Sequence, residues 1–291
     1  MDSQSKQIFI LDGATGTELD RRGVDIGLPL WSANAILEAP EILKQVHIAY
    51  LNAGADAIIT NTFRTHERSL AKAGLGSRFE ELTAKAVEIA QIARDEVNPN
   101  ALVYGSVAPL EDCYSPNLAP DHLTCKKEHG QMIRHLVKAG VDLILIETMC
   151  SAHETIAAIE AVKEFGGAHW AVSFCFSTEQ EGSLLDGTHI SELLPAVEGA
   201  QFIGINCVPA TMLSTQVTHL RELLPPEMPI AAYGNVGHRD NEGGWVITDA
   251  VDPNKFAHYA MEWVESGANI IGGCCGTTPK TIAAIRKTAN H

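Results

Sequence analysis

The chain has 291 residues, of which 45% are hydrophobic, and it carries a formal net charge of −15. This length suits either two modest domains or one α/β barrel, which typically takes about 250 residues. The negative charge argues against nucleic acid or an anionic membrane surface as a partner, and no apolar run approaches the roughly 20 residues of a membrane span.

The first residues and the cysteines indicate the compartment. Met1–Gln7 lacks the apolar core of a signal peptide, so we expect a cytoplasmic protein. Its seven cysteines are then expected to be reduced. Four of them show no pairing pattern and are interpreted as small buried or loop residues: Cys113, Cys125, Cys150 and Cys175.

Short apolar segments recur along the chain. Their hydrophobic residues run continuously instead of alternating, which is typical of strands buried on both faces. The predicted strands are Ile8–Leu11, Ala57–Thr60, Leu102–Val107, Leu143–Ile146, Trp170–Phe174, Phe202–Cys207, Ile230–Tyr233 and a last one beginning at Ile270. The predicted helices are Pro40–Asn52, Thr65–Ala73, Arg78–Glu96, a segment ending at Gly140, His153–Phe165, Ile190–Val197, Thr211–Leu224, Pro253–Glu265 and Pro279–Thr288.

Strands and helices alternate throughout the chain. Three helices are predicted to end at a glycine just before a strand, namely at Gly54, Gly140 and Gly267. No linker or change of composition divides the sequence, so residues 1–291 are taken as one domain. Eight strands, each followed by a helix, favour a single (β/α)8 TIM barrel. A doubly wound open sheet is the alternative, weakened by the absence of a G-x-G-x-x-G motif.

In such a barrel the active site lies where the strands end. The polar residues at the predicted strand ends are Asp12, Thr60, Asn61, Glu147, Asn206, Cys207, Asn235, Cys274 and Cys275. These positions converge on one face only if the barrel prediction is correct. The site and the fold are therefore predicted together.

Three of these residues are cysteines. Cys207 ends one strand, and Cys274-Cys275 follow another between glycines. A helix then begins with Thr278 as N-cap and Pro279 as its first residue. Three thiolates suit zinc and leave a fourth position open, which is typical of a catalytic site. The spacing alone also allows two ordinary core residues or a vicinal disulfide.

Other interpretations of the polar residues remain open at this stage. Asp12 could form an Asx turn before Gly13, and Glu147 could be the buried partner of a cation. The 12 histidines form no His-x-His, His-Glu-x-x-His or Ser/His/Asp arrangement, which counts against a zinc hydrolase. A non-catalytic metal-binding protein would need a fourth ligand, for which Cys175 is the nearest candidate.

The sequence resembles the homocysteine S-methyltransferases from end to end. The resemblance rests on the segments Leu11–Leu19, Leu30–Ala33, Thr60–Phe63, Gly105–Pro109, Glu147–Thr148, Gly204–Cys207 and Gly272–Pro279. The two cysteine-containing segments together are highly specific.

This resemblance implies a homocysteine-binding TIM barrel with a catalytic zinc ion on Cys207, Cys274 and Cys275. The thiolate of homocysteine would be the fourth zinc ligand, and Asp12 and Glu147 would face its ammonium group. The further substrate-binding residues expected at the strand ends and in the following loops are Thr60, Asn61, Asn206, Asn235 and Trp245.

The methyl donor is predicted less directly. No folate- or cobalamin-binding domain is found in the sequence, which favours a small onium donor. The branch that uses betaine has an aromatic residue where this chain has Thr148, whereas Tyr233-Gly234-Asn235 keeps two residues of the Tyr-Pro-Asn motif of the S-methylmethionine branch. S-methylmethionine is therefore expected ahead of betaine or a corrinoid. Trp245 and Tyr114 are candidate rings for an onium methyl group.

Overall fold

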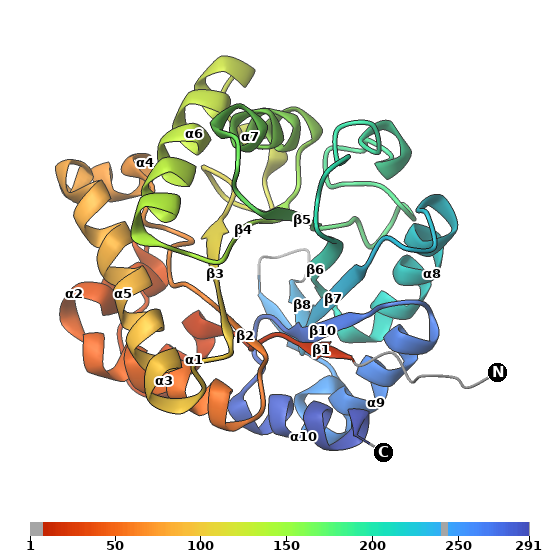
Figure 1. Ribbon diagram of the computed structural model, residues 1–291. Coiled ribbons are helices and arrows are strands. Elements are labelled where there is room, and N and C mark those ends of the chain that lie inside the picture. Colours follow the sequence, from red (N-terminus) through yellow and green to blue (C-terminus); the bar gives the residue numbers. More distant parts are fainter. Residues whose placement is uncertain (1–7, 240–243, 291) are drawn as a thin grey trace.

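The computed structural model describes residues 8–239 and 244–290. Eight parallel strands form one sheet in the order β1-β10-β7-β6-β5-β4-β3-β2, and they form a ring at the centre of Figure 1. The strands are β1 (Phe9–Ile10), β2 (Ala57–Ile59), β3 (Leu102–Val107), β4 (Leu143–Met149), β5 (Trp170–Phe174), β6 (Ile203–Pro209), β7 (Ile230–Asn235) and β10 (Ile270–Gly273). The prediction of a (β/α)8 barrel is confirmed.

The first and second strands close the ring. Leu11 forms a parallel bridge with Ala57, directly beyond β1. Two backbone hydrogen bonds flank this bridge, from Asp56 N to the Ile10 carbonyl (2.7 Å) and from Asp12 N to the Ala57 carbonyl (3.1 Å). The sheet is thus a closed barrel and not an open doubly wound sheet.

Helices surround the strands (Figure 1). They are α1 (Thr15–Arg21), α2 (Asn34–Glu38), α3 (Pro40–Asn52), α4 (Glu67–Ala71), α5 (Phe79–Val97), α6 (His122–Ala139), α7 (Ala152–Phe165), α8 (Leu213–Leu223), α9 (Pro253–Glu265) and α10 (Pro279–Ala289). The start of α10 matches the prediction, because Thr278 and Thr281 form a capping box and Pro279 is at the first helical position. The glycine after α6 is also as predicted, since Gly140 has φ = +82°.

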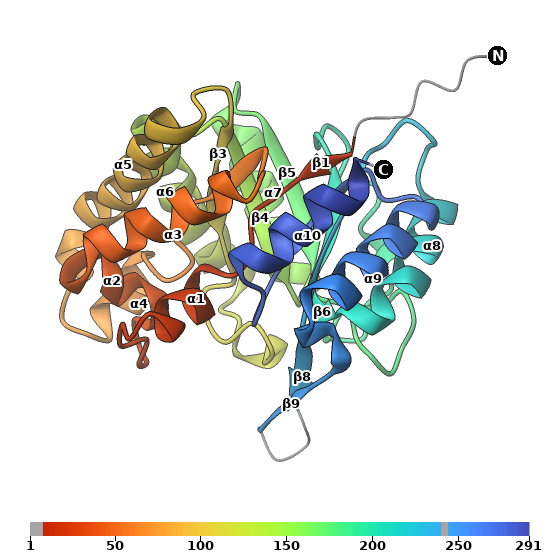
Figure 2. The ribbon, with the colours of Figure 1, turned by 90° about the horizontal axis from the view of Figure 1, so that it is seen from below.

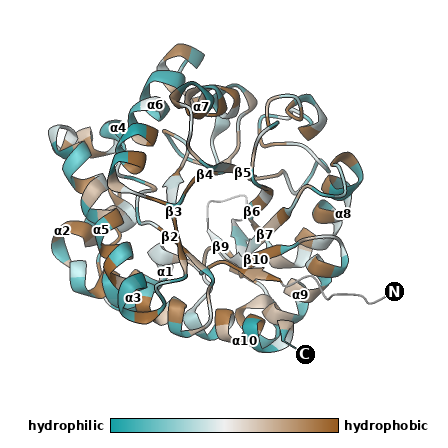
Figure 3. Ribbon diagram, in the orientation of Figure 1, coloured by the Kyte–Doolittle hydropathy of each residue, from teal (hydrophilic) through white to brown (hydrophobic). Residues whose placement is uncertain are grey.

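The hydrophobic residues form two main layers of core. One fills the interior of the barrel and includes Leu11, Leu145 and Phe202. The other lies between the strands and the inner faces of the helices, and Figure 3 shows apolar strands surrounded by helices with hydrophilic outer faces. Burial on both sides explains why the strands are continuously apolar.

The predicted helix Ile190–Val197 is wrong. Only a short 3₁₀ helix, η4 (Ile190–Glu192), forms there, followed by turns. Pro195 has no backbone N–H, and its ring would clash with the carbonyl four residues earlier in an α-helix. Gly199, at φ = +93°, then turns the chain toward β6. The prediction that a helix follows every strand therefore fails after β5.

A hairpin that the sequence analysis did not predict follows β7. Its strands β8 (Gly237–Arg239) and β9 (Trp245–Ile247) are antiparallel. In Figure 2 the hairpin projects from one end of the barrel. Since β8 begins directly after β7, this is the end at which the barrel strands finish.

Two parts of the sequence-based predictions lie outside the described residues. They are the segment Met1–Gln7, which lacks the apolar core of a signal peptide, and residues 240–243 in the loop region around the candidate Trp245. None of the helices in the described ranges is long and apolar enough to cross a membrane.

Candidate active site

A central cavity of about 380 Å³ opens at the carboxyl ends of the barrel strands. Its wall contains seven of the predicted site residues: Thr60, Asn61, Glu147, Cys207, Trp245, Cys274 and Cys275. The other three, Asp12, Asn206 and Asn235, are fully buried near the cavity and do not line it. The strand ends thus converge as the barrel prediction required.

Three of the wall residues form a thiol cluster, Cys207, Cys274 and Cys275. Their Sγ atoms all lie within 4.8 Å of one another. The Sγ atoms of Cys207 and Cys274 are 2.7 Å apart, farther than in a disulfide bond of about 2.05 Å, and every described cysteine is a free thiol. The vicinal disulfide considered above is absent from this structure, and the cluster could hold a metal ion.

The three thiols do not ionise equally. Hydrogen bonds from Cys207 and Cys274 hold the pKa of the Cys275 thiol well below its usual range. The hydrogen bond between Cys207 and Cys274, together with burial, raises the pKa of the Cys207 thiol. Without a cation, one thiolate is thus favoured at Cys275 while Cys207 stays protonated. A divalent cation would be needed to keep all three sulfurs as thiolates.

Two strained residues shape the neighbouring strand ends. Thr148 in β4 and Cys207 in β6 have φ angles of +60° and +56°, and the strand register shifts at both places. The Asn206 amide joins the two bulges, because its Oδ1 accepts from Thr148 N (3.0 Å) and its Nδ2 donates to Thr148 Oγ1 (2.7 Å). Left-handed backbone at a non-glycine residue costs about 1–3 kcal/mol, and such residues cluster at functional sites.

The Cys274-Cys275 turn is held on several sides. Asn235 Oδ1 accepts a hydrogen bond from Cys275 N (3.0 Å). Thr277 Oγ1 donates to the Cys274 carbonyl (2.7 Å). Gly276 follows with φ = +82°, which glycine adopts readily. Asn206 and Asn235 thus position the cysteine backbone or its neighbours, and neither side chain reaches the cavity wall.

Glu147 is the carboxylate of the cavity wall. Ser106 Oγ donates to its Oε1 (2.5 Å) and the Tyr233 hydroxyl to its Oε2 (3.3 Å). Burial raises its pKa to about 7. Among the described residues Glu147 makes no ion pair, so the alternative of a buried salt bridge is not borne out there.

Asp12 lies next to the wall residues Gly13 and Ile59. Its Oδ2 accepts from Ile59 N (3.0 Å), so it links β1 to β2 instead of forming the Asx turn that was considered. Burial raises the pKa of Asp12 well above its ordinary value, and the nearby Glu147 raises it further. A cationic group beside the two carboxyl groups would lower both pKa values, so this side of the cavity favours a cation.

Thr60 and Asn61 line the cavity but also support the loops around it. Thr60 Oγ1 accepts from Ser106 N (3.1 Å), and Asn61 Nδ2 donates to the Ser32 carbonyl (2.8 Å). These bonds hold the β2 end against β3 and the loop before α2.

Aromatic residues complete the wall. Trp245 in β9 and Tyr114 after β3 both line it, as proposed from the sequence. Trp31 and Phe63 line it as well, with ring centroids 5.8 Å apart at 81°, and Arg64 follows Phe63 in the wall. The sequence analysis did not assign these three to the site. The available signal was their place in or directly after two of the segments that carry the family resemblance.

A family model described as homocysteine S-methyltransferase matches residues 9–289. The chain belongs to the homocysteine S-methyltransferase family. It is 32% identical to "Homocysteine S-methyltransferase" of Escherichia coli (strain K12), over 97% of this chain and 95% of that protein. It is 31% identical to "Homocysteine S-methyltransferase YbgG" of Bacillus subtilis (strain 168), over 96% and 93%.

A solved structure of this family has the same architecture. The metallated form of the homocysteine methyltransferase MmuM from Escherichia coli superposes with a TM-score of 0.84 at 31% identity. The match covers 98% of this chain and 97% of that one. The relative was solved in a metallated form, and the thiol cluster of this methyltransferase barrel could hold a metal ion.

Neither a zinc hydrolase nor a non-catalytic metal-binding protein is supported by the described residues. No histidine and no fourth cysteine joins the thiol cluster, and Cys175 lies outside it. A zinc hydrolase centre would need histidine ligands, and a closed structural site would need a fourth protein ligand. All three cysteines line the cavity, so a molecule bound there could reach the cluster.

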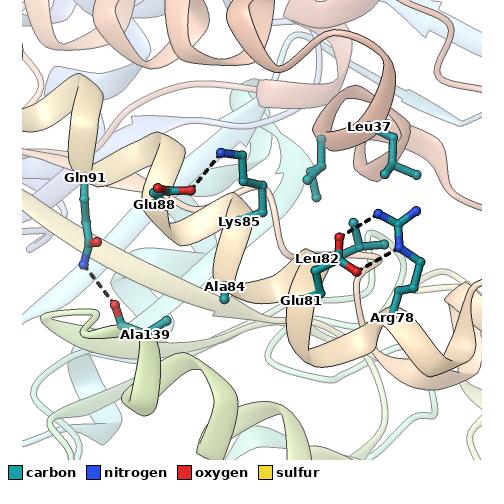
Figure 4. A pocket seen from close by; sticks show the side chains of 10 residues that line it. Leu37, Arg78, Glu81, Leu82, Ala84, Lys85, Glu88, Gln91 and Ala139 are labelled. Atoms are coloured by element: carbon teal, nitrogen blue, oxygen red, sulfur yellow. Dashed lines mark hydrogen bonds and ion pairs between the residues drawn. The ribbon is translucent and has the colours of Figure 1, made fainter.

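A larger hollow of about 580 Å³ lies on the outside of the barrel along α5 (Figure 4). Its wall carries two surface ion pairs, Arg78–Glu81 (2.7 Å) and Lys85–Glu88 (2.8 Å). The residues that line it come from helices and not from strand ends, and none is a cysteine. The thiol cluster lies in the smaller central cavity instead.

Proposed function

We propose that this methyltransferase moves a methyl group from a small onium donor to homocysteine and so forms methionine. S-methylmethionine is the favoured donor, and residues 1–291 act as one barrel domain. One observation carries the proposal: the thiol cluster and the Glu147 carboxylate share the wall of one cavity. Family membership over residues 9–289 supports it.

The proposed cofactor is one zinc ion held by Cys207, Cys274 and Cys275. Three sulfur donors within 4.8 Å of one another suit an ion with Zn–S distances of about 2.3 Å. A bound zinc ion would supply the Lewis acidity that ionises the acceptor thiol, whose ordinary pKa is about 8.5.

The acceptor would lie with its amino-acid end toward Glu147. The carboxylate of Glu147, reinforced by the neighbouring Asp12, attracts an ammonium group, and Ser106 and Tyr233 fix the carboxylate in place. This orientation directs the acceptor sulfur toward the thiol cluster on the same wall.

The donor would meet the acceptor sulfur on the open side of the cavity. A bond forms between that sulfur and the methyl carbon as the bond from carbon to the onium atom breaks. The electron pair stays on the leaving atom, and the thiol proton goes to solvent. The faces of Trp245 and Tyr114 can attract the onium methyl groups without competing as nucleophiles.

A donor panel tests the proposal. Homocysteine is offered together with ¹³C-methyl-labelled S-methylmethionine, S-adenosylmethionine, betaine, methylcobalamin or methyltetrahydrofolate, and labelled methionine is measured. We expect turnover with S-methylmethionine first and betaine second. Turnover with methylcobalamin or the folate alone would overturn the onium donor. Stable zinc binding without turnover of any donor would favour a non-catalytic metal-binding protein.

A further inference from the structure

The central cavity contains one basic side chain among the described residues that line it, and this is Arg64. The carboxyl groups of its described wall are those of Glu147 and Asp112, and the thiol cluster lies on the same wall. The whole chain carries a formal charge of −15. A basic group in such a wall favours an anion that the surrounding acidic residues would otherwise repel.

The guanidinium group of Arg64 is held in place but not satisfied. Its Nη1 donates to the Glu111 carbonyl (2.8 Å), and its central carbon lies 5.6 Å from the centroid of the Phe63 ring. Its Nε is buried without a hydrogen-bond partner, and in the described ranges Arg64 forms no ion pair. A buried donor without a partner is unfavourable, so an anion that accepts from Nε would stabilise this arrangement.

The edge of the guanidinium for which the structure describes no hydrogen bond has the geometry of a carboxylate site. Since Nη1 is bound to Glu111, the edge formed by Nε and Nη2 is the one that remains. This edge presents two parallel N–H groups, which match the two oxygens of a carboxylate. Lysine could supply the charge at this position but not the paired geometry.

We propose that Arg64 binds the carboxylate of the methyl donor and thereby selects onium compounds that carry a carboxylate. The inference rests on the proposed function, because it assigns a specificity residue to the same cavity. Donors with an onium centre and a carboxylate would be used well, and simple sulfonium ions poorly.

The place of Arg64 in the cavity assigns it to the donor and not to the acceptor. The acceptor is placed by Glu147 and the thiol cluster at the strand ends. Arg64 lies five residues beyond Ile59, the last residue of β2, and is bonded to the loop after β3. The donor must enter from this loop side, because the acceptor occupies the strand-end side.

Binding without turnover gives the first measurement. Trp31 and Trp245 line the cavity, so their fluorescence can report ligand binding. The probes are 3-(dimethylsulfonio)propionate and trimethylsulfonium, neither of which has an ammonium group for Glu147. We expect Arg64→Gln to weaken binding of the first about 10- to 100-fold and of the second less than about twofold. Arg64→Lys should recover only part of the loss.

Turnover gives the second measurement. Arg64→Gln should raise the KM for S-methylmethionine by a similar factor and leave the KM for homocysteine within about twofold. Arg78→Gln, an exposed arginine outside the cavity, is the matched control and should change neither. Equal losses for both sulfonium probes, or a raised homocysteine KM alone, would overturn the role of Arg64. Absence of methyl transfer in the wild type would instead overturn the proposed function, while the fluorescence titration still decides on Arg64.

Discussion

Folding and substrate binding favour opposite protonation states of Glu147. The residue is only 6% exposed, and its two described hydrogen bonds come from neutral hydroxyl groups. Burial raises its pKa from 4.5 to about 7. Burial therefore favours the neutral acid, whereas an ammonium ligand requires the carboxylate.

The pKa of Glu147 predicts a stability difference that depends on pH. Between pH 4.5 and about 7 the folded protein binds more protons at this residue than the unfolded chain does. Its contribution to the free energy of unfolding therefore falls as pH rises through this window and is fully lost above it. For metal-free protein, Glu147→Gln should raise the free energy of unfolding at pH 8 by up to roughly 3 kcal/mol and leave it nearly unchanged at pH 4.5. Urea unfolding at the two pH values measures this.

The same substitution should impair the reaction. The KM for homocysteine should rise about 10- to 100-fold, because a charge-assisted contact with the ammonium group is lost. Glu179→Gln, at an exposed position, serves as the control and should change neither property. A Glu147→Gln variant with lower stability at pH 8 would contradict the predicted sign.

Cys275 is the residue whose substitution tests the metal centre. Serine replaces a thiolate donor with a hydroxyl group, which is a poor zinc ligand at neutral pH. Cys275→Ser should reduce the bound metal from about one zinc ion per chain and abolish methyl transfer, measured by elemental analysis and by methionine formation. Cys113→Ser is the matched control, because Cys113 lines the cavity outside the thiol cluster. Retention of both metal and activity in Cys275→Ser would show that the three-thiolate assignment is wrong.

At the scale of elements, the strand ends bring the site residues together. Their convergence could be predicted, since apolar strands ending in Asp12, Glu147, Cys207 or Cys274 meet on one face of a parallel barrel. The left-handed conformations of Thr148 and Cys207 could not, because nothing local in a threonine or cysteine favours them. They depend on Asn206, whose partner Thr148 is 58 residues away in sequence.

Loop residues were harder to predict for the same reason. Trp31 and Arg64 reach the cavity along loops whose paths are fixed by distant contacts, such as the bond from Arg64 to the Glu111 carbonyl. The strands of the β8–β9 hairpin are short, and all three residues of β9 are exposed. The hydrophobic pattern of β8 and β9 therefore does not distinguish a strand from a loop.

The hairpin should be needed for activity more than for folding. A Cβ atom at Gly237 would lie 2.2 Å from the Val246 carbonyl oxygen, so Gly237→Ala should separate the two strands and displace Trp245 from the cavity wall. We expect kcat/KM to fall roughly 10- to 100-fold with a small change in the melting temperature.

A second glycine provides the control for this variant. Gly130 lies inside α6, where a Cβ atom would meet only Ala161 at an ordinary 3.7 Å. Gly130→Ala should stabilise the protein by about 0.5–1 kcal/mol and leave kcat/KM unchanged. A Gly237→Ala variant that unfolds as a whole at low temperature would show instead that the hairpin is part of the folding core.

For the whole molecule, the barrel separates stability from function along its axis. The cavity lies where the strands end, whereas the closing contact between β1 and β2 is supported near the strand starts. There Asp56 Oδ2 accepts from Ile10 N (2.8 Å) and from Arg286 of the last helix (2.5 Å). Arg286 also donates from its Nε and Nη2 to the Gly54 carbonyl (2.9 and 2.6 Å). Arg286 of the last helix is thus bonded to two residues that precede β2, and Asp56 connects it to β1.

Arg286→Ala should therefore lower stability without changing the chemistry. The variant loses a charge-assisted contact with Asp56 and two hydrogen bonds to Gly54, but the side chains of the ion pair are 22% and 32% exposed, so water screens part of the charge. We expect a loss of roughly 1–3 kcal/mol in the free energy of unfolding, measured by urea titration, with zinc content and kcat unchanged at a temperature where the variant is folded. Arg78→Ala removes an exposed ion pair with Glu81 and should cost clearly less stability than Arg286→Ala. Equal losses of stability in the two variants would show that the closing contact does not depend on Arg286. A lower zinc content or a lower kcat in folded Arg286→Ala would show that the two ends of the barrel are coupled.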